Sequence, residues 1–513
     1  MTTEPDAVSR AALSGLLGAD AAAALIAWGE REALTVQVPA DAWKNGGYTA
    51  AILAPVYVTD TCTGTQLVVV KCLPPEQSAE TDAHGTAIHE CPAEFRQHLV
   101  EQLYPPIATA GGRTLMFQSQ AGTSSEWRPL AELPPRRLAA ACEAVTRSLI
   151  ADWNPDRQVR TTGAVDYLRG EVDKARSLGR QTLGQGAVAH LPWVRTGEDL
   201  PMPNPLLLHT GESLLGEFQI DLVVGRAHGD LHGQNVLLRQ YADHAEPDTF
   251  VLVDLMTYES RCPLDRDLVT LLLSAISPLL ADASDRQRRL MLDVMVDQQA
   301  PCDEIAPAFG ATVSAVWRTA DDALRRCGRE VWRRQYLLSL IAHGLIFTTF
   351  DDLGPDRRWW YYRLAGYAAR ELLRAVDAAP VPDQVPVVSN PFTSPVSPGG
   401  SDQIDIPASG GLLSSTEVRG LDLGGAGRIG RREVSYSGPV KVRVCQGLYA
   451  EWPELADYVG VPAWEKARFK AGRGASEVWE WLERRFRMDE LAPALRELGR
   501  PELADILDRD LTG

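Results

Sequence analysis

One long stretch of this chain is unsuited to any packed core, and it divides the sequence. Residues 377–437 are rich in Ser, Gly and Asp, and they contain Pro380, Pro382, Pro386, Pro391, Pro395 and Pro398. Such a composition cannot bury enough apolar surface to offset the conformational entropy lost on ordering. We therefore expect a flexible linker there, with a large folded region before it and a small one, 438–513, after it.

Before the linker, strand-like segments come first and helix-like segments follow. A helix is expected over 7–33 and another from Pro92. The expected strands are 33–39, a stretch ending at Val58, 66–72, and a hairpin over 107–118. After Pro129 the pattern is mostly helical. This order predicts an α+β fold with an N-terminal helical extension, a small sheet-rich lobe and a large helical lobe, over 1–34, 35–128 and 129–376.

The segment His228–Leu238 carries the most specific chemical pattern. Asp230 precedes Asn235 in a loop, and an apolar strand follows. A loop of this length lets the Asp carboxylate reach a substrate hydroxyl while the Asn amide oxygen turns back to a metal ion. The apolar run 250–253 ends at Asp254, and a hairpin around 240–248 would place this carboxylate beside Asn235. Asn235 and Asp254 could then hold Mg²⁺ together with ATP phosphates.

A lysine upstream is expected to complete this pattern. Lys71 ends the β-prone run 67–71, and we expect it to steady the ATP phosphates. A buried lysine needs a carboxylate partner, and Glu94 is the first choice with Glu90 as the alternative. The turn at 45–49 could lie over the phosphates, so nucleotide contacts are also expected from Gly46, Gly47 and Thr49.

The ordered set of residues resembles a known family. The loop 228–235 resembles the catalytic loop of aminoglycoside and choline phosphotransferases, which are relatives of the protein kinases. The segment 263–268 is similar to a part of that family where an Asp opens a helix and braces the catalytic loop. The resemblance implies this role for Asp267, with Asp265 as the second choice. His228 is expected to brace the loop by hydrogen bonding, and Gly229 to permit a close backbone approach.

The resemblance covers about 35–375 and extends in particular to kinase-like ternary-complex-associated proteins of bacterial conflict systems. It implies a two-lobed protein-kinase-like fold and transfer of the ATP γ-phosphoryl group to a hydroxyl acceptor, with ATP and Mg²⁺ as cofactors. Asp230, Asn235, Asp254 and Lys71 would be the catalytic residues. Asp254 is followed by Leu255-Met256 instead of Phe-Gly. A pseudokinase scaffold and an aminoglycoside- or choline-like small-molecule kinase are therefore alternatives.

After the linker the pattern becomes amphipathic. Helices are expected at 448–459, 464–470, 478–486, 491–498 and 503–507, which predicts a compact all-α bundle. The segments 480–483 and 498–503 resemble the death-like effector-associated domains of bacterial signalling proteins. This resemblance implies an adaptor that binds a protein partner. The alternative is a stabilising cap on the kinase-like region.

Composition excludes some functions. A net charge of −17 argues against a nucleic-acid-binding surface, which needs a basic face. The cysteines form no C-x-x-C pair, so neither a zinc site nor a disulfide framework is predicted. No apolar stretch reaches the roughly 20 residues of a membrane helix, and the acidic N-terminus lacks a signal-peptide pattern. We expect a cytoplasmic protein without a membrane partner.

Overall fold

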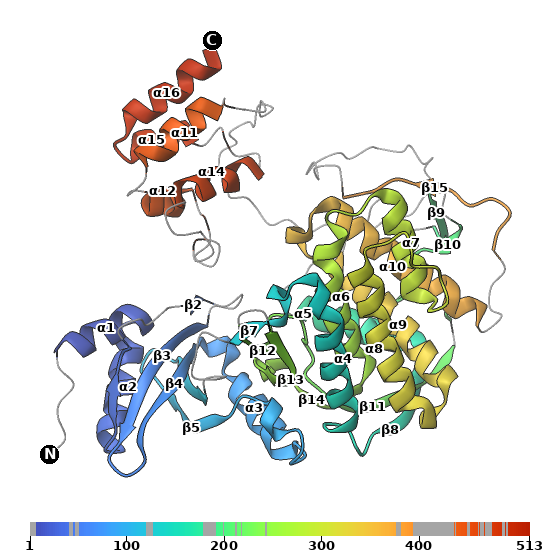
Figure 1. Ribbon diagram of the computed structural model, residues 1–513, viewed down its shortest axis with the longest axis horizontal. Coiled ribbons are helices and arrows are strands. Elements are labelled where there is room, and N and C mark those ends of the chain that lie inside the picture. The colour runs from blue at the N-terminus through green and yellow to red at the C-terminus, as the bar shows by residue number, and fades with distance from the viewer. Residues whose placement is uncertain are drawn as a thin grey trace, which may run out of the picture. The chain divides into compact units, whose positions relative to one another are not determined.

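The computed structural model describes two compact units, Met1–Ala40 with Pro55–Ser397, and Asp41–Ala54 with Pro398–Gly513. Within them it describes residues 7–39, 45–46, 51–119, 127–177, 191–197, 200–210, 213–216, 218–241, 244–375, 381–392, 436, 438–448, 452–459, 461, 466, 474–484, 488 and 491–512. The predicted α+β class is confirmed, because the N-terminal part is rich in strands and the following part is mainly helical (Figure 1).

The N-terminal part is built around an antiparallel sheet. Its strands are β1 (Thr35–Gln37), β3 (Ile52–Asp60), β4 (Gly64–Leu73), β6 (Thr114–Ser119) and β5 (Gln102–Ala108), in this spatial order. A short strand, β2 (Asn45–Gly46), pairs with the start of β3. The predicted hairpin over 107–118 is confirmed by β5 and β6, although β5 begins earlier than expected.

Two helices precede the sheet where one was expected. α1 (Ala7–Leu17) and α2 (Ala19–Arg31) are separated by Gly18, whose φ of 89° lies outside the helical range. Glycine adopts such a backbone angle at little cost, so the helix ends at Gly18, where the apolar pattern predicts a continuous helix. Trp28 of α2 stacks on Phe117 of β6, with ring centroids 4.4 Å apart. This contact fixes α2 on the sheet.

The helix that follows β4 lies earlier than predicted. After a short helical turn, η1 (Pro75–Gln77), α3 covers Ala79–Glu90, and another turn, η2 (Arg96–His98), comes later. The prediction of a helix beginning at Pro92 is wrong. Pro92 lies beyond the end of α3, and the preceding residue, Cys91, is extended with φ −71° and ψ 125°. Proline disfavours the helical conformation of the residue before it, so Pro92 follows the end of α3 and does not start a new helix.

The second part of this unit contains three small sheets and most of the helices. The strand orders are β14-β11-β8, β13-β12-β7 and β10-β9-β15. The strands are β7 (Trp127–Pro129), β8 (Gln158–Gly163), β9 (Trp193–Thr196), β10 (Met202–Pro203), β11 (Gln219–Ala227), β12 (Val236–Tyr241), β13 (His244–Leu252), β14 (Glu259–Pro263) and β15 (Val387–Val388).

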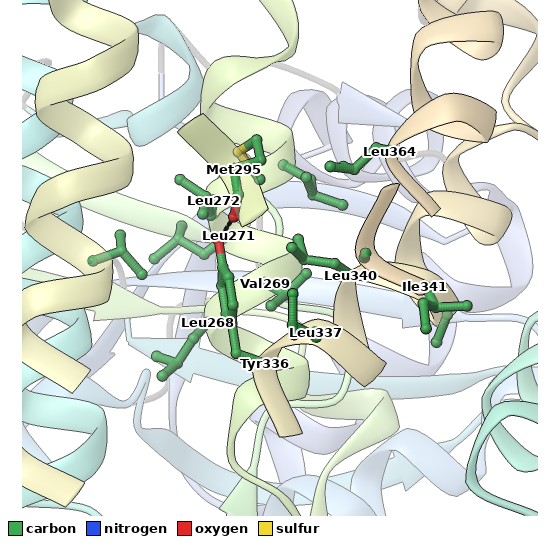
Figure 2. Close-up of a cluster of buried hydrophobic side chains, with 14 of the residues drawn as sticks. Leu268, Val269, Leu271, Leu272, Met295, Tyr336, Leu337, Leu340, Ile341 and Leu364 are labelled. Atoms are coloured by element: carbon green, nitrogen blue, oxygen red, sulfur yellow. Dashed lines mark hydrogen bonds between the residues drawn. The ribbon is translucent and has the colours of Figure 1, made fainter. Parts of the chain in front are cut away.

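The helices of this part pack against one another around a shared core. They are α4 (Pro135–Ala151), α5 (Ala164–Ser177), α6 (Asp265–Ile276), α7 (Asp285–Val296), α8 (Pro307–Leu324), α9 (Arg329–Phe347) and α10 (Gly354–Arg374). Short helical turns connect them: η3 (Leu130–Glu132), η4 (Pro205–Leu207), η5 (Leu255–Thr257), η6 (Ser277–Leu280), η7 (Arg325–Cys327) and η8 (Asp351–Leu353). Figure 2 shows side chains of α6 and α9 meeting in this core, where the Tyr336 hydroxyl donates to the Met295 carbonyl at 3.2 Å.

Part of the segment predicted as linker packs on this unit. Residues 381–392 are described, and β15 within them pairs in parallel with β9. Arg358 of α10 lies over the ring of Phe392, 4.6 Å from its centroid. The apolar residues between the prolines therefore allow this stretch to pack on the unit. The average composition of 377–437 does not reveal these residues, so it predicts a linker throughout.

The C-terminal unit has a hydrophobic core of its own. Its helices are α11 (Gly438–Gly447), α12 (Trp452–Tyr458), α14 (Gly474–Arg484), α15 (Leu491–Glu497) and α16 (Pro501–Thr512). The helix predicted over 448–459 is observed as α12, which begins later than expected. Those predicted at 478–486, 491–498 and 503–507 correspond to α14, α15 and α16, while that at 464–470 falls almost entirely outside the described residues. Trp479 is buried among aliphatic side chains, as expected of a core residue. Across the described residues, none of the helices has both the length and the apolar character needed to span a membrane.

Candidate active site

The loop 228–235 lies between two strands and closes on itself. It follows β11 and leads directly into β12. The backbone N–H of His232 donates to the carbonyl of Asp230, and that of Asn235 donates to the carbonyl of His232, both at 2.9 Å. The Asn235 side-chain amide also donates to the Asp230 carbonyl at 2.9 Å. These bonds bring Asp230 and Asn235 together between the end of β11 and the start of β12.

A buried carboxylate anchors the start of this loop. Asp267, in the first turn of α6, accepts hydrogen bonds from the backbone N–H of His228 at 2.6 Å and of Gly229 at 2.9 Å. Burial raises the pKa of the Asp267 carboxyl, against the opposing influence of His228 and the two amides. The ring Nε2 of His228 lies 2.8 Å from the carbonyl of Val253. Asp267 and His228 therefore fix the loop from two sides.

The loop passes very close to the segment that follows Asp254. Gly229 has a φ of 88°, and a Cβ atom built on it would lie 2.0 Å from the carbonyl oxygen of Thr257. The Thr257 hydroxyl donates to the His228 carbonyl at 3.0 Å. Any other residue at 229 would push these two backbones apart, so the close approach requires glycine.

The β12–β13 hairpin brings Asp254 to the loop. Val236 pairs with Leu252, and the N–H of Val253 donates to the Asn235 carbonyl at 3.1 Å. The predicted hairpin is therefore confirmed, with a tighter turn than expected. Asp254 itself has φ 64° and ψ 61°, a left-handed conformation that Asp tolerates better than most residues. This conformation ends the strand and starts η5.

Lys71 reaches the site from the N-terminal sheet. It lies on β4, only 5% exposed, and its Nζ atom is 2.5 Å from Glu80 Oε1 and 3.1 Å from Asp254 Oδ1. Burial alone would lower the pKa of Lys71, but the charges of Asp254 and Glu80 outweigh it and raise the pKa. Lys71 therefore stays a cation and joins two segments that are far apart in the sequence.

The carboxylate partner predicted for Lys71 is wrong. Glu80, in the first turn of α3, takes the role expected of Glu94. Glu94 is exposed in the turn after Pro92, because the helix that was expected to carry it ends before that proline. The alternative, Glu90, lies at the other end of α3 and accepts a hydrogen bond from the Tyr258 hydroxyl at 2.8 Å.

Glu80 could have been found from the sequence by a different choice of helix start. Pro74 and Pro75 follow β4 directly, and proline favours the first turn of a helix. A helix placed there carries Glu76 and Glu80 in its first turns, which makes both of them candidate partners of Lys71. Of the residues expected to contact nucleotide in the turn, Gly46 is described as part of β2, whereas Gly47 and Thr49 lie outside the described residues.

The oxygen atoms offered by Asn235 and Asp254 suit Mg²⁺. This ion prefers oxygen ligands and is commonly bound by one or two protein groups together with phosphates and water. The Asn235 amide nitrogen donates to the Asp230 carbonyl, so the amide oxygen is the atom of this side chain that could bind a metal ion. The side chain of Asp254 is 34% exposed. The residues present therefore fit the ion.

Comparisons with known proteins add one clear result. Residues 438–510 match the family model described as Bacterial Death-like domain 3. The match spans helices α11 to α16, and it confirms the predicted death-like character of the C-terminal unit. No curated protein has a sequence that matches the chain.

Solved structures overlap with the chain only loosely. One is a glucosamine kinase in complex with glucosamine, ADP and inorganic phosphate, 13% identical, with a TM-score of 0.33 and coverage of 70% of this chain and 87% of that one. A second glucosamine kinase structure, crystal form A, is 14% identical, with a TM-score of 0.31 and coverage of 72% and 82%. Superpositions at these scores are too loose to assign a fold or an activity.

Proposed function

We propose that the first unit is an ATP- and Mg²⁺-dependent phosphotransferase with a two-lobed, kinase-like arrangement. The observation that carries this proposal is the position of the Lys71 ammonium group, held between Glu80 and Asp254. The register of the β12–β13 hairpin, in which the Val253 N–H donates to the Asn235 carbonyl, supports Asn235 as a second metal ligand near Asp254. A buried cation beside partly exposed oxygen ligands suits a polyphosphate with its metal ion.

Each residue then has a defined role. Lys71 would bind the α- and β-phosphates, and Asn235 and Asp254 would hold Mg²⁺, which would supply charge neutralisation at the phosphates. Asp230 accepts the proton of the acceptor hydroxyl as that oxygen bonds to the γ-phosphorus. The bond between the γ-phosphorus and the bridging oxygen breaks, and ADP leaves. Positioning and charge neutralisation supply most of the rate enhancement.

The segment between Asp254 and Asp267 favours an enzyme that needs no phosphorylation of its own. It is short and consists of η5, β14 and the start of α6. β14 pairs with β11, for example Val224 with Pro263. A strand fixed in a sheet leaves no long loop to be ordered by a phosphate group.

We propose that the C-terminal unit is an adaptor that recruits a protein partner in a bacterial signalling or conflict complex. Its match to a bacterial death-like domain and its separate hydrophobic core support this role. We place the protein in the cytoplasm, where ATP is available.

The test is incubation of the full chain with γ-labelled ATP and MgCl₂. We expect label on the protein, on an added partner or on a small hydroxyl compound. Asp230→Ala should lower transfer by about 10²–10⁴-fold, the usual contribution of a general base, while ATP still binds. Asp254→Ala should lose the Mg²⁺-dependent part of ATP binding.

A matched control is available on the neighbouring strand. Asp221 of β11 is exposed and interacts with Thr161, away from the loop. Asp221→Ala should transfer label as the wild type does. Wild-type rates in the Asp230→Ala variant would refute the role given to Asp230.

A further inference from the structure

Helix α3, which supplies Glu80, has little apolar surface to hold it in place. Its fully buried residues are Glu80, His84 and Ala87, of which only Ala87 is apolar, and Ile88 is partly buried against the core. Burial of one methyl group stabilises a helix by about 1 kcal/mol or less. Gly85 in the middle of the helix further lowers its intrinsic stability. Polar contacts at the two ends of α3 therefore add substantially to the small apolar contact that Ala87 and Ile88 make with the core.

Polar contacts are made at both ends, and at the C-terminal end the Arg96 guanidinium donates to the Ile88 carbonyl at 2.7 Å. At the N-terminal end Glu80 pairs with Lys71. At the C-terminal end, Glu90 Oε2 accepts from the Tyr258 hydroxyl at 2.8 Å. Tyr258 follows η5 directly, so the segment that begins at Asp254 also holds the far end of α3.

The Tyr258 hydroxyl is presented from a rigid platform. Its ring stacks on Trp153 with centroids 6.0 Å apart, and Trp153 stacks on Phe95 at 4.7 Å with an interplanar angle of 3°. Trp153 is fully buried in the core of the unit, and Tyr258 is 9% exposed. Burial, followed by the contact with Glu90, raises the pKa of Tyr258, so the hydroxyl keeps its proton and remains a donor.

Another side of α3 is not packed. A cavity of about 830 Å³ is lined by Thr81, Asp82, Gly85 and Ile88 of α3 and, across from them, by residues around β5 such as Leu103 and Tyr104. Helix movement into open space meets little steric resistance. The polar contacts at the ends of α3, together with the packing of Ala87 and Ile88 on the core, oppose such a shift.

We propose that Tyr258 and Glu90 are positioning residues, which hold α3 so that Glu80 stays on Lys71. This inference rests on the proposed function for its effect on ATP, but not for its effect on the helix. Without the Tyr258–Glu90 bond, α3 moves more freely and Lys71 spends less time oriented toward the phosphates. The consequence is weaker ATP binding with no change in the groups that contact the reacting atoms.

The experiment measures amide hydrogen exchange over 79–90 in the nucleotide-free chain, and ATP affinity by calorimetry in MgCl₂. Tyr258→Phe should speed exchange in α3 by about 10-fold, as expected for the loss of one hydrogen bond to a charged group. ATP affinity should fall by about 3- to 10-fold. Glu90→Ala should have the same effects, and the double variant should add nothing further.

Two controls separate positioning from general damage. Glu90→Gln keeps an oxygen that accepts from Tyr258 but loses the charge, and it should speed α3 exchange clearly less than Tyr258→Phe does. Tyr362→Phe removes another tyrosine hydroxyl bond, to Asn204 at 3.0 Å, in a core distant from α3 in the sequence, and should leave α3 exchange unchanged.

Unchanged α3 exchange in Tyr258→Phe would overturn the inference, as would an equal effect in Tyr362→Phe. If the wild type binds no ATP, the proposed function fails, but the exchange experiment still decides whether Tyr258 and Glu90 hold the helix.

Discussion

The close approach of the loop at Gly229 to Thr257 allows a worked prediction for Gly229→Ala. The added Cβ would lie 2.0 Å from the Thr257 carbonyl oxygen, whereas real Cβ contacts essentially never fall under 3.0 Å. The position of Cβ is set by the backbone, so no side-chain rotation relieves the clash. The loop or the segment at Thr257 must move by about 1 Å or more.

The cost can be added from two terms. A non-glycine residue in the left-handed region, at a φ of 88°, costs about 1–2 kcal/mol. The movement would also break or lengthen the 2.9 Å bond from the Gly229 N–H to Asp267, and a hydrogen bond to a charged group contributes about 1.5–3 kcal/mol. We expect the free energy of unfolding to fall by about 3–5 kcal/mol.

The assay is urea unfolding of the full chain, followed by near-ultraviolet circular dichroism, with Gly233→Ala as the matched control. Gly233 lies on the same loop without a positive φ, and its added Cβ would lie 3.1 Å from the Ala131 nitrogen. We expect the control to cost about 1 kcal/mol or less, since a shift of a few tenths of an ångström relieves the contact. Equal losses in the two variants would refute the argument from backbone geometry.

Two further predictions concern buried charges. Lys71→Met leaves the Glu80 carboxylate, which is 1% exposed, buried without its partner, and it should lower the free energy of unfolding by about 3–5 kcal/mol. The double variant Lys71→Met with Glu80→Gln should lose less stability, and urea unfolding of both variants tests this difference. Burial raises the pKa of Asp265, which is bonded to Gln335, to about 7. The folded protein thus binds this proton more tightly than the unfolded chain, and wild-type stability should fall relative to Asp265→Asn between about pH 4 and 7, by up to about 1.4 kcal/mol per pH unit in urea titrations at several pH values.

The loop and the hairpin could be predicted because their determinants are local. The spacing from Asp230 to Asn235 fixes a loop, and the apolar runs on both sides of the 240–248 turn fix an antiparallel pair. Register then places Asp254 without any knowledge of the rest of the fold. A pattern in a short segment of sequence is enough for such features.

The partner of Lys71 could not be read in the same way. α3 has almost no apolar periodicity, so the usual signal for a helix is absent, and the sequence favours Pro92 as a helix start instead. The bond between Glu90 and Tyr258 joins residues far apart in the chain, and only the folded core around Trp153 brings them together. Such contacts depend on tertiary packing, which composition and spacing do not contain.

Burial separates the acidic residues that support the site from those that are suited to chemistry. Glu80 and Asp267 are buried and bonded to Lys71 and to backbone amides, respectively, and Glu90 is bonded to a tyrosine. The side chains of Asp230 and Asp254 are 30% and 34% exposed, respectively. A carboxylate that binds a metal ion or a substrate hydroxyl must be accessible to it. A carboxylate that positions the backbone makes stronger hydrogen bonds when it is shielded from water. In the proposed enzyme, the same residue type would therefore serve two purposes, and exposure would decide which.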